Sequence, residues 1–185
     1  MTIGKGRVPL LLLLLSSNSF AAKYPIECLY VDVVTGTELT NHPNCAAIVD
    51  ANPVFSPQHL SKMFFNRGLA AVNVQQQWYY VMRSGRSLAV IAFDNGADNF
   101  SEGLVRSLVN GKVSYFDRRL RQVIPPNHDW GWPFENDRAL VCDGCKLGQP
   151  DAEGHIAVSD GDWYYINKSG RAVAPYPAYH ATPDT

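Results

Sequence analysis

The sequence lacks an excess of charge of either sign. Its 185 residues include 16 lysines and arginines and 17 aspartates and glutamates, a formal net charge of −1. A nucleic-acid-binding chain normally carries a clear basic excess, so the charge balance speaks against that class. With 46% hydrophobic residues the chain is also too apolar to be disordered. Its length suits one domain of about 150 residues plus an additional segment.

The sequence also lacks a recognisable catalytic or cofactor motif. It has no Gly-x-Ser-x-Gly, no His-Glu-x-x-His and no phosphate-binding glycine loop, and its five histidines are scattered. Residues 94–98 resemble a calcium loop only superficially, because Gly96 is the third residue whereas an EF-hand has its glycine at the sixth. We therefore predict a chain that is not an enzyme and that has neither a metal nor a cofactor.

Only one stretch of the sequence is strongly hydrophobic. It spans residues 8–15, follows Lys5 and Arg7, and is followed by Ser19-Phe20-Ala21, a small-x-small cleavage pattern. This combination is typical of a secretory signal peptide over residues 1–21. The run is much shorter than the ~20 residues that span a bilayer. We expect a periplasmic or secreted protein that does not span the membrane.

The sequence contains four cysteines, and export favours disulfides over metal or thiol chemistry. Three pairings are possible, and proximity favours Cys28–Cys45 and Cys142–Cys145. Cys142-Asp-Gly-Cys145 also permits a redox role, although the turn-forming residues after it are not the helix start that lowers a thiol pKa. A zinc site would need two more ligands, and His155 is the only nearby candidate.

One pattern occurs three times between residues 65 and 171. An upstream piece (65–72, 100–107, 134–141) precedes an aromatic block (74–86, 109–118, 159–171) in each copy, and the third copy has an insertion at about 142–157. Asn110-Gly111 and Asp160-Gly161 are strong signals for two-residue hairpin turns. The flanking segments are aromatic and β-branched, as strands prefer. We predict a mainly all-β fold with three tandem antiparallel β-hairpin repeats over residues 64–174.

The segments outside the repeats have different patterns. Residues 22–63 are predicted to form a separate N-terminal cap with a strand over 29–34. They also include a short helix that begins at Ser56-Pro57 and ends near residue 64. Residues 175–185 contain three prolines and are predicted to be a flexible tail.

The repeats resemble those of the WG-repeat family of bacterial β-repeat proteins. The match includes Trp78, the Ser84-Gly85-Arg86 turn and the linking Val123-Ile124-Pro125-Pro126. The glycine that follows tryptophan in the family is replaced by tyrosine in two copies, and the second copy has Val113 in place of tryptophan. The resemblance implies a non-enzymatic β-repeat scaffold in an exported bacterial protein, without catalytic residues or a common ligand.

Two sets of residues are candidates for binding another protein. The insertion and the hairpin after it carry five carboxylates, Asp143, Asp151, Glu153, Asp160 and Asp162, against Lys146 alone. Three aromatic residues in Gly- and Pro-containing segments are candidate apolar anchors: Trp130, Trp132 and Tyr176. The basic cluster of Arg118, Arg119 and Arg121 is interpreted as a solvated turn.

These features predict a non-catalytic protein-binding module. A more specific hypothesis is an immunity protein that neutralises a toxic secreted effector such as a phospholipase, with the acidic insertion filling a basic cleft. One alternative is an envelope structural or carbohydrate-binding repeat protein that uses the same aromatic residues. Another is a thiol–disulfide redox protein that uses Cys142 and Cys145.

Overall fold

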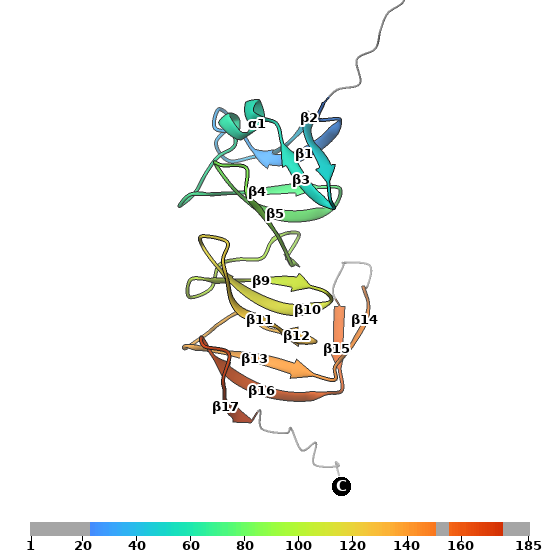
Figure 1. The fold of residues 1–185 in the computed structure, drawn as a ribbon, viewed down its shortest axis with the longest axis vertical. Coiled ribbons are helices and arrows are strands. Elements are labelled where there is room, and N and C mark those ends of the chain that lie inside the picture. The colour runs from blue at the N-terminus through green and yellow to red at the C-terminus, as the bar shows by residue number, and fades with distance from the viewer. Residues whose placement is uncertain (1–22, 151–155, 176–185) are drawn as a thin grey trace, which may run out of the picture.

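The repeated pattern folds into three units, each built around three antiparallel strands that pair in order within a sheet (Figure 1). The computed structural model describes residues 23–150 and 156–175. The first unit comprises β4 (Leu69–Val74), β5 (Gln77–Met82) and β6 (Ser87–Val90). The second comprises β9 (Leu104–Val109), β10 (Lys112–Asp117) and β11 (Gln122–His128), and the third β13 (Arg138–Asp143), β16 (Asp162–Asn167) and β17 (Ala172–Pro175). The predicted all-β architecture with one short helix is confirmed.

The first two strands of every unit pair in the same register. In each unit the first residue of the first strand lies opposite the last residue of the second strand. These pairs are Leu69↔Met82, Leu104↔Asp117 and Arg138↔Asn167. The same tight turn precedes each unit, closed by the bridges Asn66↔Leu69, Ser101↔Leu104 and Glu135↔Arg138. The internal repeat of the sequence therefore corresponds to a repeated geometry.

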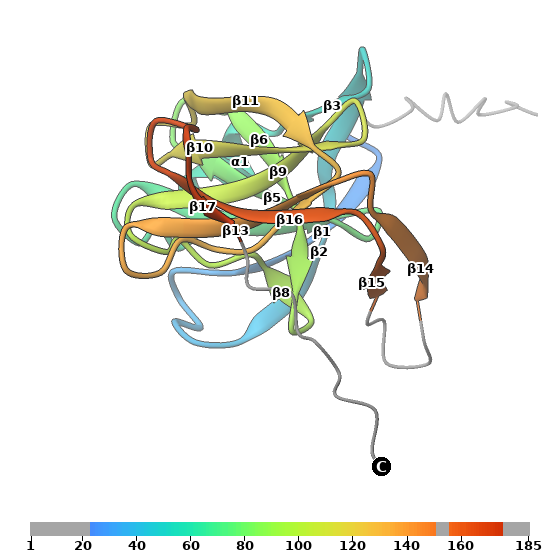
Figure 2. The same cartoon turned by 90° about the horizontal axis from the view of Figure 1, so that it is seen from below.

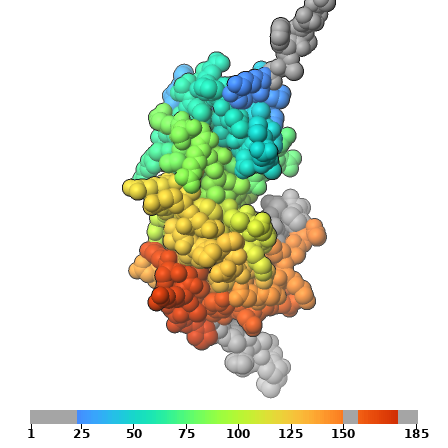
Figure 3. All heavy atoms as spheres, in the orientation of Figure 1, coloured from blue at the N-terminus to red at the C-terminus, as the bar shows by residue number. Residues whose placement is uncertain are grey.

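The units pack face to face into a column, and they follow one another along it in chain order (Figure 3). Because side chains alternate between the faces of a strand, β10 contributes to two cores. Val113 and Tyr115 belong to the core shared with the third unit, whereas Phe116 packs on the core shared with the first. The second unit is thus covered on both faces.

The N-terminal segment does not form a sheet of its own. Strands β1 (Ile26–Val31), β2 (Leu39–Val49) and β3 (Asn52–Phe55) precede helix α1 (Pro57–Lys62). Strand β1 pairs with β4, which makes one six-stranded sheet in the order β3-β2-β1-β4-β5-β6. This pairing satisfies the backbone groups that a free edge of β4 would expose. A disulfide between Cys28 and Cys45, with Cα atoms 5.7 Å apart, joins β1 to β2.

Short strands complete the column. Strands β7 (Ala92–Phe93) and β8 (Gly96–Ala97) form a small hairpin between the first and second units, and β12 (Trp130–Gly131) pairs with β13. Residues 144–161, which lie between β13 and β16, carry the hairpin β14 (Lys146–Pro150) and β15 (Ile156–Ser159). This hairpin projects from the side of the column (Figure 2).

The two predicted hairpin turns have different outcomes. Asn110-Gly111 connects β9 to β10 with φ of 52° and 77°, as a tight hairpin turn requires. Asp160-Gly161 also has positive φ, but it connects β15 to β16, which do not pair with each other. The prediction of a hairpin at this second site is wrong, because β16 pairs instead with β13 across the insertion.

Candidate functional site

Acidic and metal-ligating side chains do not gather into a metal site in residues 23–150 and 156–175. No group of three or more histidine, cysteine, aspartate or glutamate residues lies within metal-binding distance in these ranges. Over the same residues, no helix has the length and apolar character needed to cross a membrane.

The loop that superficially resembles a calcium site has a structural role. Asp94-Asn95 forms the turn between β7 and β8. The carboxylate of Asp98 is buried and accepts from Arg106, with Nη2–Oδ1 and Nε–Oδ2 distances of 2.7 and 3.0 Å. Arg106 is itself only 1% exposed, and its Nη1 donates to the carbonyl oxygen of Gly131 at 2.9 Å. This ion pair joins β8, β9 and β12.

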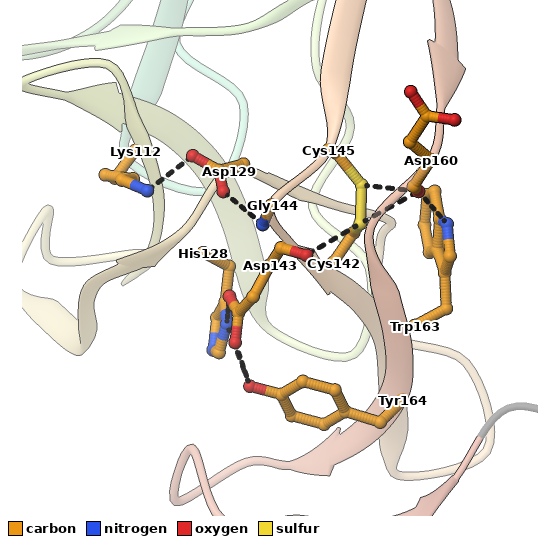
Figure 4. The surroundings of a disulfide bond; sticks show 10 residues. All are labelled: Lys112, His128, Asp129, Cys142, Asp143, Gly144, Cys145, Asp160, Trp163 and Tyr164. Carbon is orange, nitrogen blue, oxygen red and sulfur yellow. Dashed lines mark hydrogen bonds and ion pairs between the residues drawn. A yellow bond between two sulfur atoms is a disulfide. The ribbon is translucent and has the colours of Figure 1, made fainter.

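The projecting hairpin is closed at its base by the second disulfide. Cys142 and Cys145 are bonded, with Cα atoms 6.0 Å apart, and Trp163 Nε1 donates to the Asp160 carbonyl oxygen at 3.0 Å (Figure 4). Gly161 lies against this bridge. A Cβ atom there would be 2.6 Å from Cys142 Sγ and 2.7 Å from the Asp143 carbonyl oxygen. The crossing from β15 to β16 therefore requires glycine.

Polar contacts fasten the same base to the column. Tyr164 Oη donates to Asp143 Oδ2 at 2.6 Å, and His128 Nδ1 lies 2.9 Å from Asp143 Oδ1 (Figure 4). Burial, and then the contact with Asp143, raise the pKa of Tyr164 to about 12. Asp129 accepts from the Gly144 backbone N–H at 2.7 Å and forms an ion pair with a lysine on β10. The hairpin thus emerges from a rigid base.

The candidate partner-binding residues have different positions. Asp151, Glu153 and Tyr176 lie outside the described residues. Asp143 is held at the base of the hairpin, as described above. Asp160 pairs with Lys146 at 3.0 Å, and Asp162 is exposed.

The aromatic candidates also differ from one another. Trp132 is 40% exposed, whereas Trp130 is only 9% exposed and belongs to the core between the second and third units. The Arg106 guanidinium lies 5.8 Å from the centroid of the Trp130 ring. The structure therefore places Trp130 inside the protein and not on a binding surface.

A basic surface lies at the other ends of the strands, and the cluster of Arg118, Arg119 and Arg121, interpreted from the sequence as a solvated turn, is one part of it. We define the turn edge as residues 65–69, 82–87, 100–104, 117–121, 134–138 and 167–171. The Arg86 side chain donates to the Leu120 carbonyl oxygen, and Lys168 pairs with Glu102, so the turns of neighbouring units lie on the same side. This side is at the left of Figure 1, opposite β14 and β15.

The turn edge carries nine cations and four carboxylates, a net charge of +5. Six of the cations occupy two equivalent positions of the turns after β5, β10 and β16: Arg83, Arg118 and Lys168 at one, and Arg86, Arg121 and Arg171 at the other. The recurrence of cations at these positions of the repeat is the sequence signal that would have revealed the edge.

A hollow of about 340 Å³ opens between the first sheet and the second unit. Its lining combines apolar side chains, including Leu39, Phe64 and Phe100, with polar groups from Asn66, Asn99 and the cationic Arg118. Comparison with protein-family models, with curated proteins and with solved structures found no match to this chain.

Proposed function

We propose that the chain is a non-enzymatic, exported protein-binding module and that the projecting hairpin, residues 144–161, contacts the partner. One observation carries this proposal. In the second unit a two-residue turn, Asn110-Gly111, is sufficient to connect the strands, and the third unit has the same strand pairing. The hairpin is therefore additional to what the fold needs, and additional segments on a rigid scaffold commonly carry function.

The way in which the hairpin is fastened supports a binding role. The Cys142–Cys145 bridge and the contacts of Asp143 and Asp129 hold its base before any partner arrives. A preorganised segment loses less conformational entropy on binding, so more of its contact energy appears as affinity. Leu147, 42% exposed, offers an apolar contact on β14.

A thiol–disulfide redox role is less well supported by the same geometry. The attacking sulfur of an oxidoreductase must be accessible and lie in an environment that stabilises its thiolate. Cys142 is completely buried in the core between the second and third units. Nor does the bridge lie at the start of a helix, because both cysteines flank the end of β13.

The more specific proposal is an immunity-type inhibitor in the periplasm. An enzyme that acts on an anionic substrate such as a phospholipid presents a basic cleft. Asp160 and Asp162, together with Asp151 and Glu153 of the same segment, would complement that cleft. Such complementarity mainly raises the association rate and the specificity.

The test compares the intact protein with a hairpin-less variant as baits for envelope extract. In the variant, residues 144–162 are replaced by Asn-Gly-Lys, the turn sequence of the second unit, and Cys142 becomes alanine. Shortening the connection lowers its closure cost by about 2 kcal/mol. This gain offsets the loss of the short disulfide, about 2 kcal/mol. We expect a moderately lower melting temperature, because Cys145 and Val158 no longer pack on the core between the second and third units, and a partner that only the intact bait retains.

A charge-reversal pair sharpens this test. Asp160→Lys with Asp162→Lys should weaken the complex, and more strongly at low salt, because screening at high salt already reduces the attraction. The matched control reverses Glu27 and Glu38, two exposed carboxylates outside the hairpin. Equal retention by the intact and hairpin-less baits, or insulin reduction that disappears in Cys145→Ser, would contradict the proposal.

A further inference from the structure

The turn edge is basic while the remainder of the molecule is acidic. Outside the edge, the described residues have five cations and ten carboxylates, a net charge of −5. The nearly neutral composition therefore conceals a strong separation of charge. A surface with this local excess attracts anionic partners and raises their association rate.

Two arginines of the turn edge are held in place by aromatic rings, and one of them, Arg118, also lines the hollow. The guanidinium of Arg83 lies 4.4 Å from the centroid of Phe65, and that of Arg118 lies 4.3 Å from the centroid of Phe100. Stacking orders a guanidinium and leaves its N–H groups free to bind a carboxylate. No carboxylate of the described residues forms an ion pair with either arginine.

The hollow adds an apolar component to this charged surface. It lies beside the turns that carry Arg67 and Arg119, since Asn66 and Arg118 are among its lining residues. Leu39 and Phe64 line it and remain 47% and 46% exposed. Large apolar side chains that stay exposed next to a hollow leave contact area for an apolar group of a ligand.

We propose that the turn edge docks an acidic peptide segment of a partner protein, with an apolar side chain in the hollow and carboxylates on Arg67, Arg83, Arg118 and Arg119. A nucleic acid fits less well, because a single strand stacks successive bases on several rings. Phe65 and Phe100 each have an arginine over the ring, which leaves Phe64 as the one largely exposed aromatic side chain that lines the hollow. An anionic glycan would match the charges but leave the hollow unfilled. This surface is independent of the hairpin and has the opposite charge.

Four labelled probes separate these partners in a fluorescence anisotropy titration at low salt. They are a random copolymer of glutamate and tyrosine, polyglutamate of the same length, heparin and single-stranded DNA. We expect the copolymer to bind about tenfold more tightly than polyglutamate, because burial of one apolar side chain contributes at least that factor. The absence of copolymer binding, or heparin or DNA binding as tightly as the copolymer, would overturn the proposal.

Two pairs of variants locate the binding. Arg67→Glu with Arg119→Glu should weaken the copolymer and polyglutamate at least tenfold, whereas Lys23→Glu with Lys146→Glu, the same change of charge away from the edge, should not. Leu39→Ser should weaken only the copolymer. The control Leu108→Ser, at a residue 48% exposed on β9, should change neither affinity. The assignment is contradicted if the double arginine variant binds the copolymer as tightly as the intact protein does, or if Leu39→Ser leaves the affinity for the copolymer unchanged.

The hairpin-less protein distinguishes this proposal from the proposed function. Because the turn edge and the hairpin lie at opposite ends of the strands, the hairpin-less variant should bind the copolymer as the intact protein does. Loss of copolymer binding in that variant would overturn the turn-edge site even if the hairpin's own partner had been found. Melting temperatures of all variants confirm that the measured changes are not due to unfolding.

Discussion

The second and third units are built from the same pair of strands in the same register, yet they differ in what connects those strands. A two-residue turn joins β9 to β10, whereas a disulfide-closed hairpin separates β13 from β16. The strand pairing does not change with the connection, because both connections begin and end at the equivalent pair of residues in the ladder, Val109↔Lys112 in the second unit and Asp143↔Asp162 in the third. In stacked units of this kind the paired strands maintain the fold, and the connections between the strands can therefore vary in length.

The two units also differ at the position of a buried charge. Arg106 of β9 lies opposite Tyr115, and Leu140 of β13 lies opposite the equivalent Tyr165. Arg106 is buried with Asp98, whereas Leu140 needs no partner and is half-buried. The second unit is covered on both faces and contains a buried charged residue, Arg106. The third unit lies at the end of the column and has no charge at the equivalent position.

Breaking the buried ion pair between Asp98 and Arg106 should have the largest effect on the stability of the protein. We expect Asp98→Ala to lower the free energy of unfolding by about 3–5 kcal/mol, because it leaves the Arg106 guanidinium buried without its counter-ion. Urea denaturation followed by tryptophan fluorescence measures the change. Asp94→Asn, at an exposed position of the same hairpin, should change the free energy by less than about 0.5 kcal/mol.

A double variant makes the second unit resemble the third. Arg106→Leu with Asp98→Val should recover most of the lost stability, because no charge then remains buried. Recovery is incomplete, since the Arg106 backbone N–H also donates to Asp98. A double variant as unstable as Asp98→Ala would show that the cost comes from packing and not from the unpaired charge.

The next largest effect should be the difference between the two disulfides in how much each contributes to stability. Cys28 and Cys45 are 17 positions apart in the sequence, whereas Cys142 and Cys145 are three apart. Replacing the first pair with alanine should cost about 3 kcal/mol and replacing the second about 2 kcal/mol, because the longer loop restricts the unfolded chain more. Urea denaturation of the two oxidised double variants gives the comparison. A larger loss for the second pair would show that its bridge also supports the native contacts around the hairpin base.

Exchanging the turn residues of the first and second units should have the smallest effect on stability. Gln75 and Gln76 adopt φ of 50° and 66°, a region that costs most side chains about 1 kcal/mol each, whereas the second unit has Asn110-Gly111 in the same place. Gln75→Asn with Gln76→Gly should therefore stabilise the protein by about 1 kcal/mol. Asn110→Gln with Gly111→Gln should destabilise it by a similar amount. Thermal denaturation of both variants measures the change, and no shift in either would mean that the backbone relaxes when the residues change.

Local features of the fold were predictable from the sequence. The Asn110-Gly111 turn, the helix start at Ser56-Pro57 and both cysteine pairings depend on residues close together in the chain. Asp160-Gly161 has the same local signal and the same positive φ, but it does not close a hairpin. The partner of a strand is decided by the whole sheet, which a two-residue signal does not contain.

The sequence by itself determined the periodic strands, the Asn110-Gly111 turn and the disulfide-closed insertion, because each follows from backbone conformation and contacts over short separations. Only the tertiary structure decided that Trp130 is buried, that Asp98 neutralises Arg106 and that the basic turns form one edge. These depend on which faces and ends of the units meet when the sheets stack. Stacking brings together residues from different units, and a net charge near zero conceals how they are distributed in space.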